Sequence, residues 1–419
     1  MKKLFSHDAY SAFSFPEFKY FVAARFLLTV SWQIQAIVFG WFIYSFTKDP
    51  LSLGFIGLAE AIPSISIALF GGYLADKYDR RKLILIFLTI FFFTSAGLAF
   101  FTFNGQNNLE TYGTLPVYVM IFITGIVRGV LGPTSVAFSA QLIPKKEYAN
   151  ASAWSSSVWQ LGAVAGPAIG GLVYGFGSAY MASVVSCIGI ILTMLLYTRI
   201  SSKPIPKTTI HLSLFENLTT GIRFVIKNKV MLTAISLDLF AVLFGGAVAL
   251  LPMFADQVLG TGAEGLGVLR AAPAFGAVIM AILLAYKPPV HKAGSKLLWA
   301  VAGFGICMIC FALSKNFYLS MALLALAGMF DNVSVVIRAT IMQALTPDDM
   351  RGRVSAVNTI FIGSSNEIGA FESGVAARIL GLIPSVIFGG CMTLLVVGMS
   401  YRFAPSLRKM NLAKVLSSS

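Results

Sequence analysis

Long apolar runs, broken by short polar turns, cover almost the whole chain. Each run comes close to or exceeds the roughly 20 mostly apolar residues that a helix needs to cross a bilayer. The turns between the runs contain Gly, Pro, Asn or charged residues. The pattern therefore predicts twelve membrane-spanning helices, over residues 18–46, 53–75, 83–103, 115–137, 150–174, 178–199, 230–256, 264–286, 297–314, 317–343, 353–377 and 382–402.

The longest polar stretch separates the sixth run from the seventh. It contains an amphipathic piece around residues 215–224. The first apolar run is a full span that follows a polar start, so we expect no cleavable signal peptide. The division predicts an N-terminal six-helix bundle at 1–199, a cytoplasmic central loop at 200–229, a C-terminal six-helix bundle at 230–403 and a cytoplasmic tail at 404–419.

The composition agrees with a polytopic membrane protein. Hydrophobic residues make up 57% of the chain and charged residues 11%, against about 25% charged residues in soluble domains. So few charges exclude a soluble enzyme and a disordered chain. The four Cys lie inside apolar runs, and the three His lie in polar segments without a metal-binding pattern. No phosphate-binding loop is present. We therefore expect no metal, no cofactor and no enzymatic activity.

The basic residues predict the orientation in the membrane. With both termini in the cytoplasm, 24 of the 31 Lys and Arg fall in cytoplasmic segments and only 3 in outer loops. This is the positive-inside distribution, so we expect both ends of the chain to be cytoplasmic. It also explains the net charge of +14 without nucleic acid as a partner.

The two halves of the chain share weak internal similarity. Gly57–Pro63 in the second span and Gly267–Pro273 in the eighth both read Gly-x5-Pro, and they place Glu60 opposite Arg270. A shift of 203 residues aligns further Gly and Pro positions of the fifth and eleventh spans. Parallel repeats of this kind are typical of transporters built from two related halves.

Three motifs carry a family resemblance. Gly72–Lys82 is similar to the loop signature of the major facilitator superfamily, with Asp79 where that signature has Gly. Arg128–Gly132 resembles the superfamily's membrane-embedded Arg motif, and Gly162–Gly171 matches the motif of its antiporters. The resemblance covers nearly the whole chain. It implies an all-α membrane protein with twelve transmembrane helices in two pseudo-symmetric six-helix bundles.

A narrower resemblance, to the enterobactin-exporter group, rests on Asp76–Lys82, Leu269–Pro273 and Asp349–Val354. That group exports siderophores and drug-like molecules. The resemblance therefore implies efflux across the cytoplasmic (inner) membrane of a bacterium.

The loop motif and the glycine-rich fifth span are expected to act in conformational switching. A carboxylate is stabilised by up to about 1–2 kcal/mol at a helix N-terminus, and the resemblance implies that Asp76 makes such a contact with the eleventh span. It also implies that the fifth span moves against the eighth. The alternatives are charges that serve topology alone and plain small-residue packing. The residues concerned are Gly72, Asp76, Arg80, Arg81, Gly162, Gly166, Pro167, Gly170 and Gly171.

Charges inside spans are costly unless they are paired or hydrated, so each is a candidate for function. Asp331 and Arg338 are seven residues apart and share a helix face, and they could be only a permanent ion pair. Arg25 could snorkel to the cytoplasmic interface, and Asp238 could cap a helix interface. Glu367 and Asp331 are the candidates for a proton site. We expect a substrate and proton cavity from Arg25, Trp32, Arg128, Asp238, Asp331, Arg338, Glu367 and Glu372, and interface charges at Glu60 and Arg270.

These observations favour secondary export of a small organic molecule by proton antiport with alternating access. The expected partners are that substrate, protons and the lipid bilayer, and we expect a monomer. One alternative is an importer of a nutrient or siderophore. Another is a lipid flippase or a transport-inactive membrane scaffold, although a scaffold has no need of ionisable cavity residues.

Overall fold

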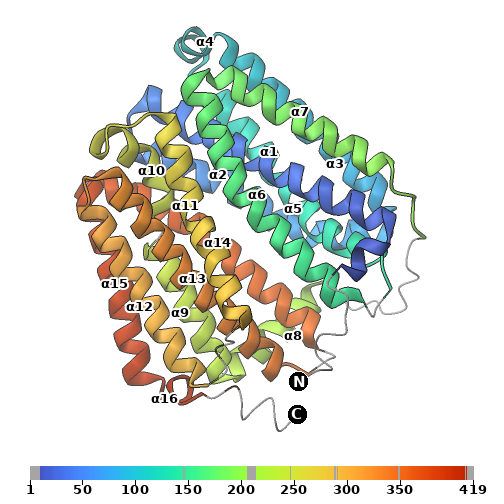
Figure 1. Ribbon diagram of the computed structural model, residues 1–419, viewed down its shortest axis with the longest axis vertical. Coiled ribbons are helices and arrows are strands. Elements are labelled where there is room, and N and C mark those ends of the chain that lie inside the picture. The colour runs from blue at the N-terminus through green and yellow to red at the C-terminus, as the bar shows by residue number, and fades with distance from the viewer. Residues whose placement is uncertain are drawn as a thin grey trace. The chain divides into compact units, whose positions relative to one another are not determined.

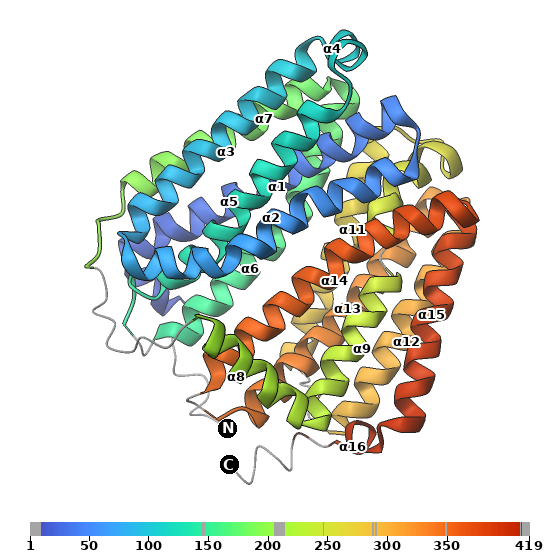
Figure 2. The same ribbon diagram turned by 180° about the vertical axis from the view of Figure 1, so that it is seen from behind.

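The computed structural model of the protein describes residues 10–144, 147–204, 214–245, 247–286, 289, 291–347, 350–410 and 412. Its regular structure is helical, and the described residues contain no strand (Figures 1 and 2). Residues 205–213 of the predicted central loop lie outside the described residues, as do half of the predicted tail and Asp349 of the narrower motif.

A long helical segment lies at each of the twelve predicted runs, and the all-α fold class is confirmed. Ten of these segments are long and apolar enough to cross a membrane, within the part of the chain that the structure describes. The helices are α1 (Pro16–Thr47), α2 (Pro50–Lys77), α3 (Arg80–Phe103), α5 (Leu115–Ser139), α6 (Tyr148–Phe176), α7 (Ala179–Thr198), α9 (Lys229–Gly245), α11 (Ala263–Tyr286), α12 (Ala293–Leu313), α13 (Phe317–Leu345), α14 (Arg351–Leu380) and α15 (Leu382–Phe403).

Shorter helices depart from the predicted pattern. The seventh run is not one uniform helix, because α9 ends at Gly245 and is followed by η3 (Ala247–Leu250), α10 (Leu251–Met253) and the π-helical turn η4 (Phe254–Val258). Pro252 lies in the first turn of α10, where the N–H that proline lacks has no partner within the helix. The polar stretch between the third and fourth predicted spans is largely helical, in α4 (Gly105–Tyr112). The amphipathic piece forms α8 (Leu214–Lys227), and α16 (Pro405–Arg408) follows α15.

The contacts between residues divide the chain into two compact units. Unit 1 consists of Met1–Phe42 and Ile62–Ile210, and unit 2 consists of Ile43–Ala61 and His211–Ser419. The end of α1 and the first part of α2 therefore pack with the C-terminal helices.

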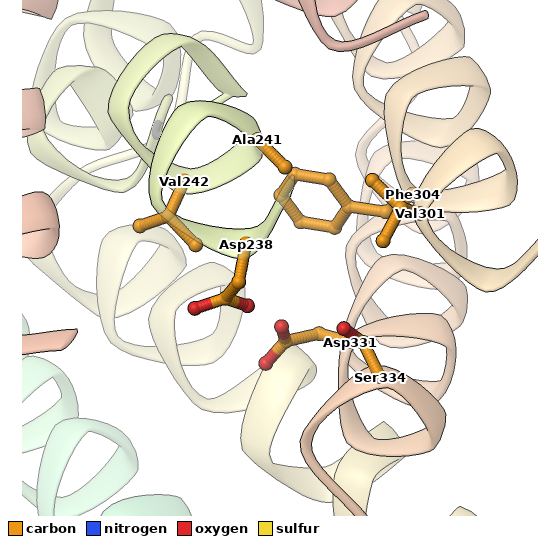
Figure 3. A pocket seen from close by; sticks show the side chains of 7 residues that line it. All are labelled: Asp238, Ala241, Val242, Val301, Phe304, Asp331 and Ser334. Atoms are coloured by element: carbon orange, nitrogen blue, oxygen red, sulfur yellow. The ribbon is translucent and has the colours of Figure 1, made fainter. Parts of the chain in front are cut away.

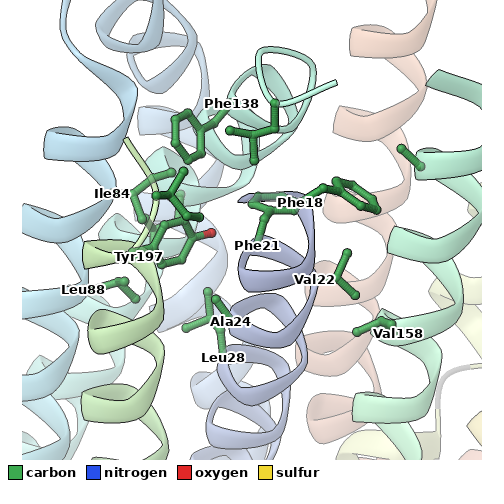
Figure 4. Close-up of a cluster of buried hydrophobic side chains, with 14 of the residues drawn as sticks. Phe18, Phe21, Val22, Ala24, Leu28, Ile84, Leu88, Phe138, Val158 and Tyr197 are labelled. Atoms are coloured by element: carbon green, nitrogen blue, oxygen red, sulfur yellow. The ribbon is translucent and has the colours of Figure 1, made fainter. Parts of the chain in front are cut away.

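Unit 1 is built around aromatic side chains. Phe18 and Phe21 of α1 are fully buried, and Phe138 of α5 and Tyr197 of α7 pack close to Phe21 (Figure 4). Ile84 and Leu88 of α3 belong to the same cluster. Large rings bury much apolar area each and pack in edge-to-face arrangements. The cluster therefore holds four helices of unit 1 together.

Unit 2 depends on close helix-to-helix approach. A Cβ atom at Gly276 of α11 would lie only 1.9 Å from the carbonyl oxygen of Ala325 in α13. Across the same contact, a Cβ atom at Gly328 would lie 2.0 Å from the carbonyl oxygen of Pro273. Small residues let helix backbones come this close in a membrane. A side chain at either position would force α11 and α13 apart.

We expect Gly276→Ala to lower the free energy of unfolding by about 1–3 kcal/mol, because the added methyl group overpacks the α11–α13 contact. The measurement is thermal unfolding of the purified protein in detergent. Gly398→Ala in α15 is the matched control, since nothing lies within 4 Å of its added Cβ atom. Equal melting temperatures for the two variants would contradict the prediction.

Candidate functional site

A buried ion pair joins α9 and α13 in unit 2. The guanidinium of Arg338 forms a salt bridge with the carboxylate of Asp238, and both side chains are less than 10% exposed. Sequence spacing suggested Asp331 as the partner of Arg338, but the structure pairs Arg338 with the other helix. A buried pair is destabilising to break, because the remaining charge loses its compensation.

Asp331 lies beside this ion pair. Asp238, Asp331 and Ser334 line one small pocket, together with apolar residues of α9 and Phe304 of α12 (Figure 3). Asp331 has no ion-pair or hydrogen-bond partner among the residues the structure describes. The buried Ser334 hydroxyl likewise has no hydrogen-bond partner. The pocket is therefore lined by two carboxylates, one of which is paired with the Arg338 guanidinium.

The size of this pocket limits what it can hold. Its cavity of about 10 Å³ is close to the least space that one water molecule needs. An organic substrate does not fit there. The pocket has the chemistry and the dimensions for a water molecule and a proton.

A second charged group in unit 2 joins three helices. Arg270 of α11 lies within electrostatic range of Glu60 of α2 and Glu367 of α14. Glu367 and Arg270 are both half-buried. Glu372 is also half-buried, but it lies five residues further along α14 and so faces a different direction.

In unit 1, an arginine and a tryptophan lie together. The guanidinium of Arg128 on α5 lies over the ring of Trp32 on α1, 5.9 Å from its centroid. The Trp32 ring in turn contacts Phe91 of α3, with ring centroids 5.2 Å apart. Arg128 is exposed, whereas Trp32 is half-buried. This arrangement is a cation–π contact with an apolar wall behind it.

Two further polar side chains lie on α1 near this contact. Arg25 is half-buried and within electrostatic range of Tyr197 on α7. The buried Nε of Arg25 has no hydrogen-bond partner among the described residues, and neither do the indole Nε1 of Trp32 and the amide of Gln35. Sequence reasoning missed Gln35. Its position one turn after Trp32, inside a span, was the available signal.

The glycines of the antiporter motif form a ridge against α1. A Cβ atom at Gly162 would lie 2.8 Å from the Thr29 side chain, and one at Gly166 would lie 2.5 Å from Cβ of Gln33. A Cβ atom at Gly170 would lie 3.0 Å from Cα of Ile34. Gly171 and Pro167 are buried in the same helix, which continues through Pro167. The ridge therefore brings α6 close to the helix that carries Arg25 and Trp32.

The loop motif forms a network inside unit 1. Arg80 is buried and donates to the carbonyl oxygens of Ala75 and Ala137. It also forms an ion pair with Asp76, whose side chain is 59% exposed. Arg81 donates to the carbonyl oxygens at the end of α7. Gly72 has open space at its Cβ position. The latch role of Asp76 stays a prediction.

Asp79, which departs from the usual loop motif, has a clear structural role. It is the N-cap of α3 and accepts hydrogen bonds from the backbone N–H groups of Arg81 and Lys82. Its other oxygen accepts a hydrogen bond from the Ser202 hydroxyl. Aspartate is among the preferred N-cap residues, because its side chain satisfies otherwise unpaired helix donors. Asp79 thus ties the loop to the start of the central loop.

The model of the major facilitator superfamily matches residues 21–370. The chain belongs to this superfamily. It is 24% identical to the enterobactin exporter EntS of Shigella flexneri over 384 residues, which is 91% of this chain and 90% of that protein. The EntS protein of Escherichia coli O1:K1 is similar at 24% identity over the same shares.

Solved transporter structures share the major facilitator fold. A D-xylose–proton symporter aligns with a TM-score of 0.71 at 16% identity, covering 95% of this chain and all of the symporter. A peptide-transporter-family (POT) protein in complex with 5-aminolevulinic acid aligns with a TM-score of 0.73 at 12% identity, covering 93% of this chain and 96% of that one. Its family and its ten described segments that are long and apolar enough to cross a membrane make the protein a multi-pass membrane transporter.

This major facilitator protein also has a polar cluster in unit 2 that sequence reasoning missed. Asp256 accepts hydrogen bonds from the Tyr44 hydroxyl at 2.9 Å and from Lys48 Nζ at 2.7 Å. Arg378 of α14 pairs with Asp49 at 2.9 Å. Lys48, Asp49 and Arg378 were read from sequence only as charges outside the hydrophobic runs. These contacts help to explain why residues 43–61 belong to unit 2.

We expect Arg338→Met to lower the free energy of unfolding by about 3–5 kcal/mol, because it leaves the buried Asp238 carboxylate without its partner. The double variant Asp238→Leu/Arg338→Met should recover most of this loss, since both charges are gone. Thermal unfolding in lipid nanodiscs measures both. A double variant no more stable than Arg338→Met would contradict the pairing.

Proposed function

We propose that this major facilitator transporter exports a small organic molecule, siderophore-like or drug-like, by proton antiport. The observation that carries the proposal is the similarity to enterobactin exporters along 91% of the chain. The antiporter motif in α6 supports the outward direction. The pairing of Asp238 with Arg338 beside Asp331 supports coupling to protons.

The proposed setting is the cytoplasmic membrane of a bacterium, with both termini in the cytoplasm and a monomer as the working unit. The orientation rests on the basic residues, of which 24 of 31 lie in segments assigned to the cytoplasm. In this orientation Lys48 and Arg378 lie on the outer side, and Arg80 and Arg81 on the cytoplasmic side.

The coupling step follows from the charges of the pocket. With both carboxylates ionised, Asp238 and Asp331 beside Arg338 carry one net negative charge in a buried place. A buried charge that lacks full compensation is unfavourable. Binding of one proton makes the group neutral. We propose that the proton enters from the outside, resides on Asp331, and leaves to the cytoplasm as the transporter alternates, while substrate moves outward.

Glu367 has a second role in this proposal. Arg270 lies within range of two carboxylates, so the Glu60–Arg270–Glu367 group also carries one surplus negative charge. Like Asp331, Glu367 can accept a proton to remove that charge. The charge-balanced ion pair of Asp238 with Arg338 holds α9 against α13 while Asp331 and Glu367 change protonation.

Metabolite analysis tests the direction of transport. We would compare a strain that lacks the gene with strains that carry the wild type or Arg128→Ala, in iron-poor and iron-rich medium, by mass spectrometry of cells and medium. We expect one compound to accumulate in cells and to decline in the medium without the gene, and Arg128→Ala to behave like the deletion at equal expression. Iron dependence would identify a siderophore.

Two results would overturn export. A compound left unused in the medium without the gene would mean uptake. No change in any soluble compound, together with altered lipid distribution between the leaflets, would mean a lipid flippase. Normal export by Arg128→Ala would show that Arg128, which we expect to line the substrate and proton cavity, is not needed for export.

We expect Asp331→Asn to abolish accumulation driven by a pH gradient, because the amide cannot take up and release the coupling proton. Exchange of labelled for unlabelled substrate without a gradient should persist. The assay is transport of the compound found above in proteoliposomes. Glu110→Gln is the control, since Glu110 is an exposed carboxylate on the short helix α4. Gradient-driven transport by Asp331→Asn at wild-type level would exclude Asp331 as the proton carrier.

A further inference from the structure

We propose that unit 1 contains the recognition site for an acidic group, so that the substrates are organic anions with an aromatic ring. The site consists of Arg128 and Trp32, with Arg25 closer to the N-terminal end of α1. This inference rests on the proposed export function and specifies its substrate class.

The distribution of charge along the spans separates the two units. Within its membrane spans, unit 1 carries two cations, Arg25 and Arg128, and no carboxylate at similar depth, because its Asp and Glu residues lie near helix ends or in loops. The spans of unit 2 carry more carboxylates than cations. These carboxylates are Glu60, Asp238, Asp331, Glu367 and Glu372. Within the spans, protons therefore have acceptors in unit 2, whereas unit 1 offers only positive charge there.

Arg128 lies at mid-depth of its span. It is 13 residues after the start and 11 residues before the end of α5, roughly 20 Å and 16 Å along the helix axis. Its side chain is nevertheless exposed. An exposed cation at this depth faces water rather than lipid, because a charge in hydrocarbon is strongly unfavourable. The Arg128 side of unit 1 therefore lines a hydrated space.

Trp32 makes this space suitable for an organic solute. The Arg128 guanidinium lies over the Trp32 ring, and Phe91 packs against the same ring. Within the described part of the chain, the buried indole Nε1–H has no acceptor. The amide of Gln35, 1% exposed and one turn further along α1, has neither donor nor acceptor there. A guanidinium and unused N–H donors recognise a carboxylate or phenolate. The ring recognises the aromatic body of the same molecule.

Arg25 extends the positive charge towards the N-terminal end of α1. It precedes Trp32 by seven residues, so it shares that face of the helix, roughly 10 Å away along the axis. Its Nε–H also has no acceptor among the described residues. In the proposed orientation Arg25 lies nearer the cytoplasm. An anion that enters from the cytoplasm meets Arg25 first and Arg128 second.

Equilibrium binding of two dyes of similar shape tests the charge preference. Fluorescein is a dianion at pH 8, and rhodamine 123 has the same fused-ring frame but is a cation. Each would be titrated by fluorescence polarisation against the purified full-length protein in nanodiscs, with no pH gradient. We expect fluorescein to bind at least about 10-fold more tightly. Equal or tighter binding of rhodamine 123 would overturn the proposal.

Two variants test whether Arg128 causes the preference for fluorescein. Arg128→Gln should weaken fluorescein binding by about 10-fold or more, because it removes a charge-assisted hydrogen bond, and Arg128→Lys should lose less. Arg402→Gln is the control, since it removes one exposed arginine at the far end of α15. An unchanged fluorescein Kd in Arg128→Gln would overturn the site. If that variant does not fold, the wild-type comparison of the two dyes still decides the substrate class.

The dye-binding result and the proposed export function can fail independently of each other. Binding is measured without a gradient, so it does not depend on proton coupling or direction. A protein that prefers fluorescein but fails to export would keep the anion site and lose the export function. A protein that exports a neutral or cationic compound by proton antiport, without binding fluorescein, would keep the function and lose the anion site.

Discussion

An ionised side chain inside a membrane must find an opposite charge or water, and this constraint organises the polar interior of the protein. Arg338 meets it by pairing with Asp238 across two helices. Arg270 meets it with two carboxylates from two other helices. Arg128 is exposed over the ring of Trp32, and our proposal gives it water there. Each of these arrangements places charged groups at a defined position in an otherwise apolar helix bundle.

Close helix contacts create the frame for these charges. In unit 2, Gly276 and Gly328 bring α11 and α13 together so closely that a methyl group does not fit. In unit 1, Gly162, Gly166 and Gly170 do the same for α6 and α1. Helices in a membrane gain little from burying apolar surface, so packing of small residues has a larger share in holding them. The glycine positions therefore help to set which charged side chains can meet.

The proposed division of tasks follows from the same charges. Within its membrane spans, unit 2 has more carboxylates than cations, as a proton carrier requires. Unit 1 has cations and unused donors beside an aromatic ring, as recognition of an organic anion requires. A cavity of about 10 Å³ beside Asp331 accommodates water or a proton and excludes an organic solute. The two kinds of cargo thus have different places in the same chain.

Much of the architecture could be predicted from local patterns. The length of each apolar run predicted a helix, and the motifs at Gly72–Lys82 and Gly162–Gly171 predicted the superfamily. At the seventh span the apolar run predicted the span but not its inner structure, in which α9 ends at Gly245 and the short helices η3, α10 and η4 follow. A mean hydropathy is insensitive to such a break, because the residues stay apolar while the backbone hydrogen bonds change.

The sequence by itself determined the positions of the long helices, the family and the list of charges inside the spans, because each of these depends on residues close together in the chain. Only the tertiary structure decided that Arg338 pairs with Asp238 rather than with Asp331, that Arg128 lies over Trp32, and that Asp256 accepts hydrogen bonds from Tyr44 and Lys48. Spacing along one helix indicates a shared face. It does not indicate which neighbouring helix that face meets, because the partner comes from a distant part of the chain through packing.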